Sequence, residues 1–288
     1  MSLVSEIAGL YRRMATDLSS DIYDGLVKAR DQEVEDTPAY TALSTIIENV
    51  DLARAEAKPI CQDTGYPIFF VTLPEGASIG KVRAAIIEAT KRATDEIPLR
   101  PNAVDAVTGK NSGDNTGMLW PLIYFDEWDR NYLLIRAMLK GGGSENCGMM
   151  YRLPDARLGA GRDLDGVRKA VLDAIHAAQG RGCPPYVIGV ALGGGKDAVT
   201  QLSKRQLLRP LDDTNPSSEL AALEARLLEE ANSLGIGPIG VGGKTCVMGV
   251  KSAAAHRHAA SYFVDVAFCC WADRKGTLEY HGNDYGRL

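Results

Sequence analysis

Short runs of consecutive apolar residues alternate along this chain with longer stretches in which apolar residues recur every three or four positions. The short runs include IFFV at 68–71, LLIRAML at 133–139 and YVIGVAL at 186–192. Runs of this length are typical of buried strands, and the longer stretches are typical of amphipathic helices. Their alternation predicts an α/β or mixed α+β fold, with helices packed around short, largely buried sheets.

The same patterns give a first map of the elements. We expect helices at 3–18, 38–57, 80–96, 163–182, 195–208 and 215–235, with further strands at 245–254 and 262–272. Asn215 is expected to cap the last of these helices and Gly235 to end it. No stretch shows a shift in composition. We therefore expect residues 1–288 to form a single large domain, with residues 1–37 as a helical N-terminal extension within it.

Two loops stand out between these elements. Residues 99–117, LRPNAVDAVTGKNSGDNTG, form a long segment rich in Gly, Asn, Asp and Pro, and long loops of this kind are usually functional or disordered. The segment KGGGSENCG follows the strand pattern at 131–139 and is also expected to be a loop, in which glycines allow close approach of a ligand.

Composition excludes several classes of function. The net charge is −5 and no basic patch carries interleaved aromatic residues, so no nucleic-acid partner is expected. No run approaches the roughly 18–20 apolar residues that cross a bilayer, and the first residues lack the features of a secretory signal. A cytoplasmic location with no membrane association is the expectation. There the six cysteines are thiols, ligands or reactive groups rather than disulfides.

The cysteines follow no compact metal-binding pattern. There is no C-x₂-C pair, and Cys61, Cys183 and Cys270 are separated by long intervals, although each lies where a loop meets an expected strand. The neighbours Cys269 and Cys270 would face opposite sides of a strand. On spacing alone, scattered cysteines are usually small buried residues.

Seven segments, in order along the chain, resemble those of class I fumarases. They are KPICQDTG, LRPNAV, KGGGSEN, RGCPPYVIGVALGG, LGIGPIGVGGKT, HRHAAS and CCWADRKGTL, which together run from about residue 40 to residue 280. More narrowly, they resemble the α-subunit of two-subunit forms, or the N-terminal domain of single-chain forms. The α-subunit of L-tartrate dehydratase shares most of these landmarks.

The resemblance implies a [4Fe–4S] cluster held by Cys61, Cys183 and Cys270. Cys269 would be the opposite-facing neighbour in the strand, and Cys147 and Cys246 match no ligand position. Three protein ligands leave one iron open, and an open metal can act as a Lewis acid on a substrate carboxylate and hydroxyl.

The resemblance also assigns substrate residues. Asp63 takes part in proton transfer and Gln62 lines the site, although on general grounds an Asp in QDTG is most often an ordinary Asx-turn. Arg100 would clamp a carboxylate with its planar guanidinium, where the alternative is an ordinary surface arginine.

Three further positions complete the implied site. Backbone amides at Gly142 and Gly143 would approach a substrate carboxylate, where otherwise these glycines form a flexible turn. His258 has a supporting role near the site.

The function implied is reversible hydration of a C4 dicarboxylate, fumarate to L-malate. L-tartrate dehydratase and mesaconate hydratase are alternatives with the same chemistry. The resemblance further implies a separate β-subunit that completes the site, with αβ pairs that associate into dimers. From a different class of protein, a non-catalytic iron or redox sensor could also hold a labile cluster on three distant cysteines.

Overall fold

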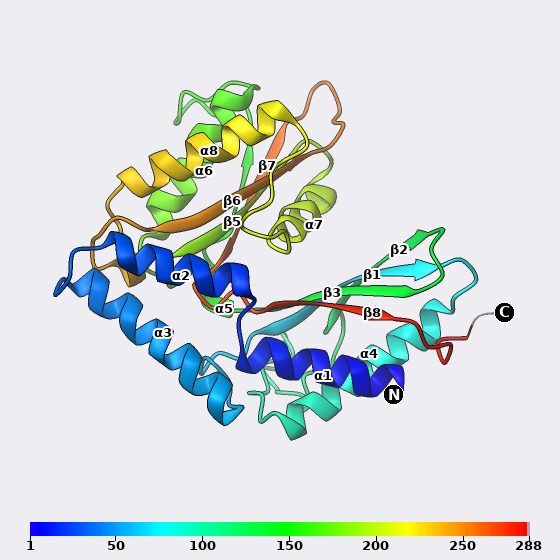
Figure 1. Ribbon diagram of the computed structural model, residues 1–288. Coiled ribbons are helices and arrows are strands. Elements are labelled where there is room, and N and C mark those ends of the chain that lie inside the picture. The colour runs from blue at the N-terminus through cyan, green and yellow to red at the C-terminus, as the bar shows by residue number, and fades with distance from the viewer. Residues whose placement is uncertain (287–288) are drawn as a thin grey trace. The chain divides into compact units, whose positions relative to one another are not determined.

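Two four-stranded sheets organise separate parts of the chain in the computed structural model, which describes residues 1–286 (Figure 1). Unit 1 contains residues 1–19, 49–142 and 272–288, and unit 2 contains residues 20–48 and 143–271. Helices and strands are combined in both units, so the expected mixed α/β fold is confirmed. The expectation of a single domain with a helical N-terminal extension stays a prediction.

Unit 1 has a mixed sheet in the order β2–β1–β3–β8. Its elements are α1 (Leu3–Thr16), β1 (Tyr66–Pro74), α4 (Ile79–Glu96), β2 (Leu122–Trp128), β3 (Leu133–Lys140) and β8 (Lys275–Tyr280). Strand β1 pairs in parallel with β2 and antiparallel with β3, and β3 pairs antiparallel with β8. Helix α1 packs on α4 and on β8 (Figure 1), so the N-terminal helix is part of this core.

Unit 2 has a mixed sheet in the order β4–β7–β5–β6. Its elements are α2 (Ser20–Gln32), β4 (Met149–Arg152), α6 (Leu164–Ala178), β5 (Tyr186–Leu192), α7 (Lys196–Gln206), α8 (Ser218–Ser233), the 3₁₀ helix η1 (Pro238–Gly240), β6 (Val247–Ala254) and β7 (Phe263–Cys269). Strand β5 pairs in parallel with β6 and antiparallel with β7, which pairs antiparallel with β4. The chain passes between the units four times: between α1 and α2, within α3 (Pro38–Glu56), within the short α5 (Gly142–Glu145), and between β7 and β8.

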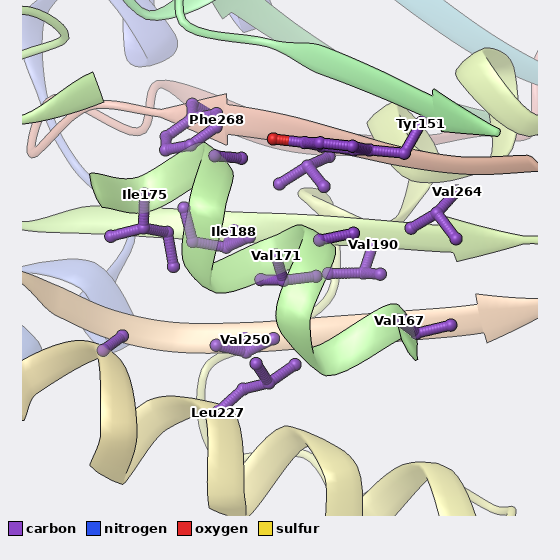
Figure 2. Packing of buried hydrophobic residues seen from close by; sticks show 14 of the residues in the cluster. Tyr151, Val167, Val171, Ile175, Ile188, Val190, Leu227, Val250, Val264 and Phe268 are labelled. Carbon is purple, nitrogen blue, oxygen red and sulfur yellow. The ribbon is translucent and has the colours of Figure 1, made fainter. Parts of the chain in front are cut away.

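The core of unit 2 forms where the apolar face of a helix packs on the apolar face of a strand. Val167, Val171 and Ile175 repeat every fourth position of α6 and lie over alternate residues Ile188 and Val190 of β5 (Figure 2). Each such side chain contributes about 1.5–3 kcal/mol when it is fully buried.

The opposite side of β5 meets α7. A Cβ added at Gly189 would lie 2.2 Å from the carbonyl oxygen of Ser203. Only glycine therefore permits this close approach of helix and strand.

The start of α8 differs from the expectation. Ser217, not Asn215, is the N-cap, because the Ser217 hydroxyl accepts from the Leu220 N–H at 3.3 Å. Asn215 is buried instead and donates to Glu224 at 2.6 Å and to the Ser252 carbonyl at 2.8 Å. Gly235, at φ +67°, follows the helix end as expected.

Several other elements were not expected. The segment KGGGSENCG contains the short helix α5 rather than only a loop, because four of its residues, Gly142–Glu145, take helical geometry. Helix α2 lies within the expected helical segment 1–37 but was not expected as a separate helix, and strands β2, β4 and β8 were not predicted from the sequence. Among residues 1–286, no helix is both long and apolar enough to cross a membrane.

Candidate active site

The loop that enters β1 holds Asp63 in a fixed orientation. Its Oδ1 accepts from the Gly65 N–H at 2.9 Å, which forms the local turn, and its Oδ2 accepts from the Gly142 N–H at 2.8 Å. Gly65 has φ +79°, and a Cβ there would lie 2.7 Å from the Leu139 carbonyl carbon. The half-buried carboxylate is therefore held by two backbone donors, one local and one distant in the chain.

A pocket of about 400 Å³ in unit 1 opens beside this carboxylate. It is lined by Asp63, Gly65, Tyr66, Arg100, Asn102, Trp120, Lys140 and Gly142. Three residues named from the sequence, Asp63, Arg100 and Gly142, thus lie around one cavity. It combines one carboxylate with two basic side chains, a composition suited to an anion that gains or loses a proton.

Arg100 reaches the pocket from a fixed backbone. Its N–H donates to the Thr64 hydroxyl at 3.0 Å, and its carbonyl accepts from the Asn115 side chain at 3.1 Å. The arginine is itself exposed. The backbone of Arg100 is fixed by hydrogen bonds while its side chain is exposed, and an accessible guanidinium can bind a carboxylate through two parallel hydrogen bonds.

Lys140 is a pocket residue that the sequence analysis did not identify. It is the last residue of β3, it is fully buried, and its ammonium donates to the Gly141 carbonyl at 3.3 Å. Burying an ammonium is costly unless polar partners compensate it, so such lysines are often functional. The available signal was its place directly before the glycines of KGGGS.

Arg274 supports the Asp63 loop from below the surface. It is 2% exposed, and one guanidinium nitrogen donates to the Asp63 carbonyl. Its own carbonyl accepts from the Leu139 N–H at 2.9 Å, which links it to β3. Its Nε is buried and has no hydrogen-bond partner among the described residues. The sequence analysis quoted this arginine only as part of CCWADRKGTL.

The other predicted substrate residues do not line this pocket. Gln62 is exposed beside Asp63. Gly143 and His258 belong to unit 2, where both are exposed, and the His258 Nδ1 accepts from the Ala260 N–H at 3.1 Å. Their assigned roles stay predictions.

The six cysteines fall into two groups by exposure. Cys147, Cys246 and Cys269 are buried, whereas Cys183 is exposed and Cys61 and Cys270 are half-buried. The accessible three are the ones that the sequence analysis named as cluster ligands. Burial raises the pKa of the Cys246 thiol to about 12, which disfavours the thiolate that a metal ligand must be.

Two of the accessible cysteines share one end of the unit 2 sheet. The Trp271 N–H donates to the Cys183 carbonyl at 3.1 Å, so the segments after β7 and before β5 run side by side there. Cys183 has φ +60°, a left-handed conformation that is uncommon for a residue other than glycine and often marks functional positions. Cys61 lies in unit 1.

The accessible thiols can be compared with two kinds of metal site, a single ion and an iron–sulfur cluster. Within residues 1–286, no three His, Cys, Asp or Glu side chains gather around one point that could hold one metal ion. A [4Fe–4S] cluster is held differently, because each cysteine binds a separate iron. Cys61, Cys183 and Cys270 carry the accessible thiols that such a cluster would need, and their role as its ligands stays a prediction.

Comparison with known proteins gives a consistent family. The family model described as fumarate hydratase (Fumerase) matches residues 4–279. A Geobacillus stearothermophilus protein that carries the name of a class I fumarate hydratase is 46% identical over 264 residues, which are 91% of this chain and 51% of that protein. The chain thus spans about half the length of this relative.

Other relatives match along nearly their whole length. The L(+)-tartrate dehydratase subunit alpha of Escherichia coli K12 is 32% identical over 283 residues, covering 98% of this chain and 91% of that subunit. A Methanocaldococcus jannaschii protein with the same subunit name is 37% identical over 280 residues, covering 96% of both chains.

Proposed function

This chain belongs to the class I fumarate hydratase family, and from that premise we propose that it is the cluster-binding half of a hydro-lyase that reversibly hydrates fumarate to L-malate. The pocket that combines Asp63 with Arg100 and Lys140 is the observation that carries the proposal. The higher identity to the protein named for fumarate hydratase, 46% against 32–37% for those named for tartrate dehydratase, favours fumarate over L-tartrate.

The basic pocket residues bind substrate, and the acidic residue transfers a proton. Arg100 and Lys140 bind and orient the substrate carboxylates, since two cations balance a dicarboxylate. Asp63 holds or releases the proton at the carbon next to a carboxylate, because that proton is weakly acidic and needs a positioned acid or base. The two backbone N–H groups at Asp63 fix the direction of its carboxylate, and Arg274 fixes the loop that carries it.

Cys61, Cys183 and Cys270 would hold the [4Fe–4S] cluster. When bound, a cluster with three protein thiolates supplies an iron with an open position, which serves as a Lewis acid toward the substrate hydroxyl. All six cysteines are free thiols, which fits a reducing compartment such as the cytoplasm.

A separate β-subunit would complete the site. The chain matches half of a longer relative and nearly all of two relatives named as alpha subunits, which supports such a division. Gln62, Gly143 and His258 are proposed to contact substrate in the complete assembly, which we propose to be a dimer of αβ pairs.

The test is turnover by the reconstituted assembly. The chain and its second subunit are purified together, loaded anaerobically with iron and sulfide, and supplied in parallel with fumarate, L-tartrate and mesaconate. Loss of the ultraviolet absorbance of fumarate measures its hydration. We expect fumarate to be the best substrate. Turnover of none of the three by a fully loaded assembly would contradict the proposal and favour an iron or redox sensor.

Variants of single residues then test the proposed role of each pocket side chain. Asp63→Asn should lower kcat by roughly 10²–10⁴-fold, the usual contribution of general acid–base catalysis. Arg100→Lys should mainly raise KM, because lysine cannot form the paired hydrogen bonds of a guanidinium. Asp95→Asn, at an exposed position of α4 outside the pocket, is the control and should leave both constants unchanged.

A further inference from the structure

The loop between α4 and β2 presents large apolar side chains to solvent. Val107 is 94% exposed, Met118 93%, Leu119 74% and Val104 54%. These four residues are called the apolar loop surface below. Val104, Val107 and Met118 line one cavity of about 680 Å³. Single exposed apolar residues are common, but a cluster around one hollow usually marks an interaction site.

Side chains within the loop hold this surface in shape. The Asp105 carboxylate accepts from the N–H groups of Val107 and Thr108 at 3.1 and 2.7 Å, and from the Thr108 hydroxyl at 2.8 Å. Val104 pairs with Asn111 in an isolated β-bridge, and the Asn111 side chain donates to the Pro101 carbonyl at 2.9 Å. The apolar side chains are therefore exposed on a braced loop.

The base of the loop is braced as well. The buried Asn115 accepts from the Asn102 N–H at 2.7 Å and donates to Thr94 of α4 at 3.1 Å. Binding to a preformed surface avoids the entropic cost of ordering a loop. The bracing thus favours a role in recognition over one in packing against the rest of unit 1.

Trp120 joins the apolar loop surface to the active site. Its ring lines both the 680 Å³ cavity and the pocket that contains Asp63 and Arg100. It contacts the Tyr66 ring, with centroids 4.8 Å apart. Its indole Nε1 is buried and lacks a hydrogen-bond partner among residues 1–286. A partner on the apolar loop surface would lie at the edge of the catalytic pocket.

We infer that the apolar loop surface docks the second, β-type subunit beside the catalytic pocket, an inference that rests on the proposed function. The longer relative supplies the reason for this occupant, since the match covers only 51% of its length and the rest of that protein is joined to the matching half in one chain. The remaining part must stay beside the same pocket if it completes the site.

The test measures association and turnover separately. Val107→Asp and Met118→Asp each place a charge in the hollow, and neither residue lines the catalytic pocket. Each should weaken binding of the second subunit by about 100-fold or more, as for hot-spot residues of protein interfaces. The matched controls are Val34→Asp and Leu52→Asp, at positions that are 63% and 57% exposed elsewhere on the chain. They should bind as the wild type does.

Sedimentation velocity and calorimetric titration give the dissociation constants, and melting curves of each variant confirm folding. At saturating second subunit, Val107→Asp should recover the wild-type kcat with fumarate, which separates docking from catalysis. The inference is overturned if the surface variants bind like the controls, or if the wild-type chain binds no second subunit. It is also overturned if Val107→Asp abolishes self-association of the chain but spares the second subunit. Intact docking without turnover would count against the proposed function alone.

Discussion

At the scale of single residues, Asp63 is both the turn residue and the candidate acid–base residue that its sequence suggested. Its Oδ1 closes the local turn with Gly65, and its Oδ2 accepts a hydrogen bond from Gly142, which is 79 residues further along the chain. The Asx-turn and the catalytic role are therefore compatible. Each oxygen accepts one backbone N–H, and a carboxylate oxygen has a second lone pair available for water or substrate.

Cysteine reactivity gives a prediction at the same scale. When the folded, metal-free chain is treated with iodoacetamide near neutral pH, we expect Cys61, Cys183 and Cys270 to be alkylated, because they are accessible. The buried three should react much more slowly in the folded chain. Cys246 should be the slowest of all, since a pKa of about 12 leaves almost no thiolate. Peptide mass mapping over a time course measures each rate.

Cluster loading provides the control for this prediction. Anaerobic reconstitution with iron and sulfide should protect all three accessible cysteines together, and Cys61→Ser should lower the iron bound. Labelling of Cys246 in the folded chain as fast as Cys183 would contradict the expected order. Protection of only one accessible cysteine would contradict the shared ligand role.

Site residues differed in how visible they were to sequence reasoning. Asp63 and Arg100 stood inside recognisable motifs and lie in one pocket. Lys140 and Arg274 stood in motifs too, but their importance comes from burial. Because lysine and arginine are usually exposed, their types predicted the opposite environment.

At the scale of elements, the expected strands were the four inner strands of the two sheets and the largely buried edge strand β6. Strands β1, β3, β5 and β7, which lie inside the sheets, show nearly continuous burial and mostly apolar sequence. The missed strands β2, β4 and β8 lie at sheet edges and are partly exposed. Edge strands carry polar and charged residues, so their sequences lack the apolar run. Strand order and direction depend on long-range pairing that no local pattern encodes.

The start of α8 gives the prediction for this scale. Ser217→Ala should lower the free energy of unfolding by about 1 kcal/mol, the usual value of an N-cap. Asn215→Ala should cost about 1–3 kcal/mol, because it removes a buried donor from Glu224 and the Ser252 carbonyl. Urea unfolding curves of the variants measure both.

Ser218→Ala is the control, since Ser218 lies one residue inside the helix and does not cap it. It should change stability by less than about 0.5 kcal/mol. If Asn215→Ala proved milder than Ser217→Ala, the buried role of Asn215 would be wrong. Asn, Pro and Ser in a row all favour a helix start, so the sequence could not rank them. The distant partner Glu224 decides which one caps.

At the scale of the whole molecule, the chain interleaves its two units. Unit 1 draws on three separate segments and unit 2 on two. Sequence analysis found no boundary because none of the four crossings lies in a linker of distinct composition, and two of them lie within helices, α3 and α5. Consequently the sequence predicts which segments form strands far better than it predicts which of the two units each strand belongs to.

Asp265 makes the stability of unit 2 depend on pH in an unusual direction. Burial in β7 raises its pKa above the ordinary value of 3.8, although hydrogen bonds from Ser203 and Thr200 oppose the rise. Lys204 also lowers the pKa and Glu145 raises it. The folded chain therefore holds this proton more tightly than the unfolded chain does. By linkage, the contribution of Asp265 to stability declines as the pH rises from 3.8 through the raised value.

Asp265→Asn should remove this decline. We expect the free energy of unfolding of the wild type, relative to the variant, to be smaller at pH 8 than at pH 4, as measured by urea titrations at both values. Asp173→Asn is the opposite case, because hydrogen bonds from Arg157 lower the pKa of Asp173 below 3.8. The wild-type advantage over that variant should be full above pH 3.8 and fade as the pH falls through the lowered pKa. Parallel pH profiles for the two variants would contradict the assignment, since burial and ion pairing shift stability in opposite directions.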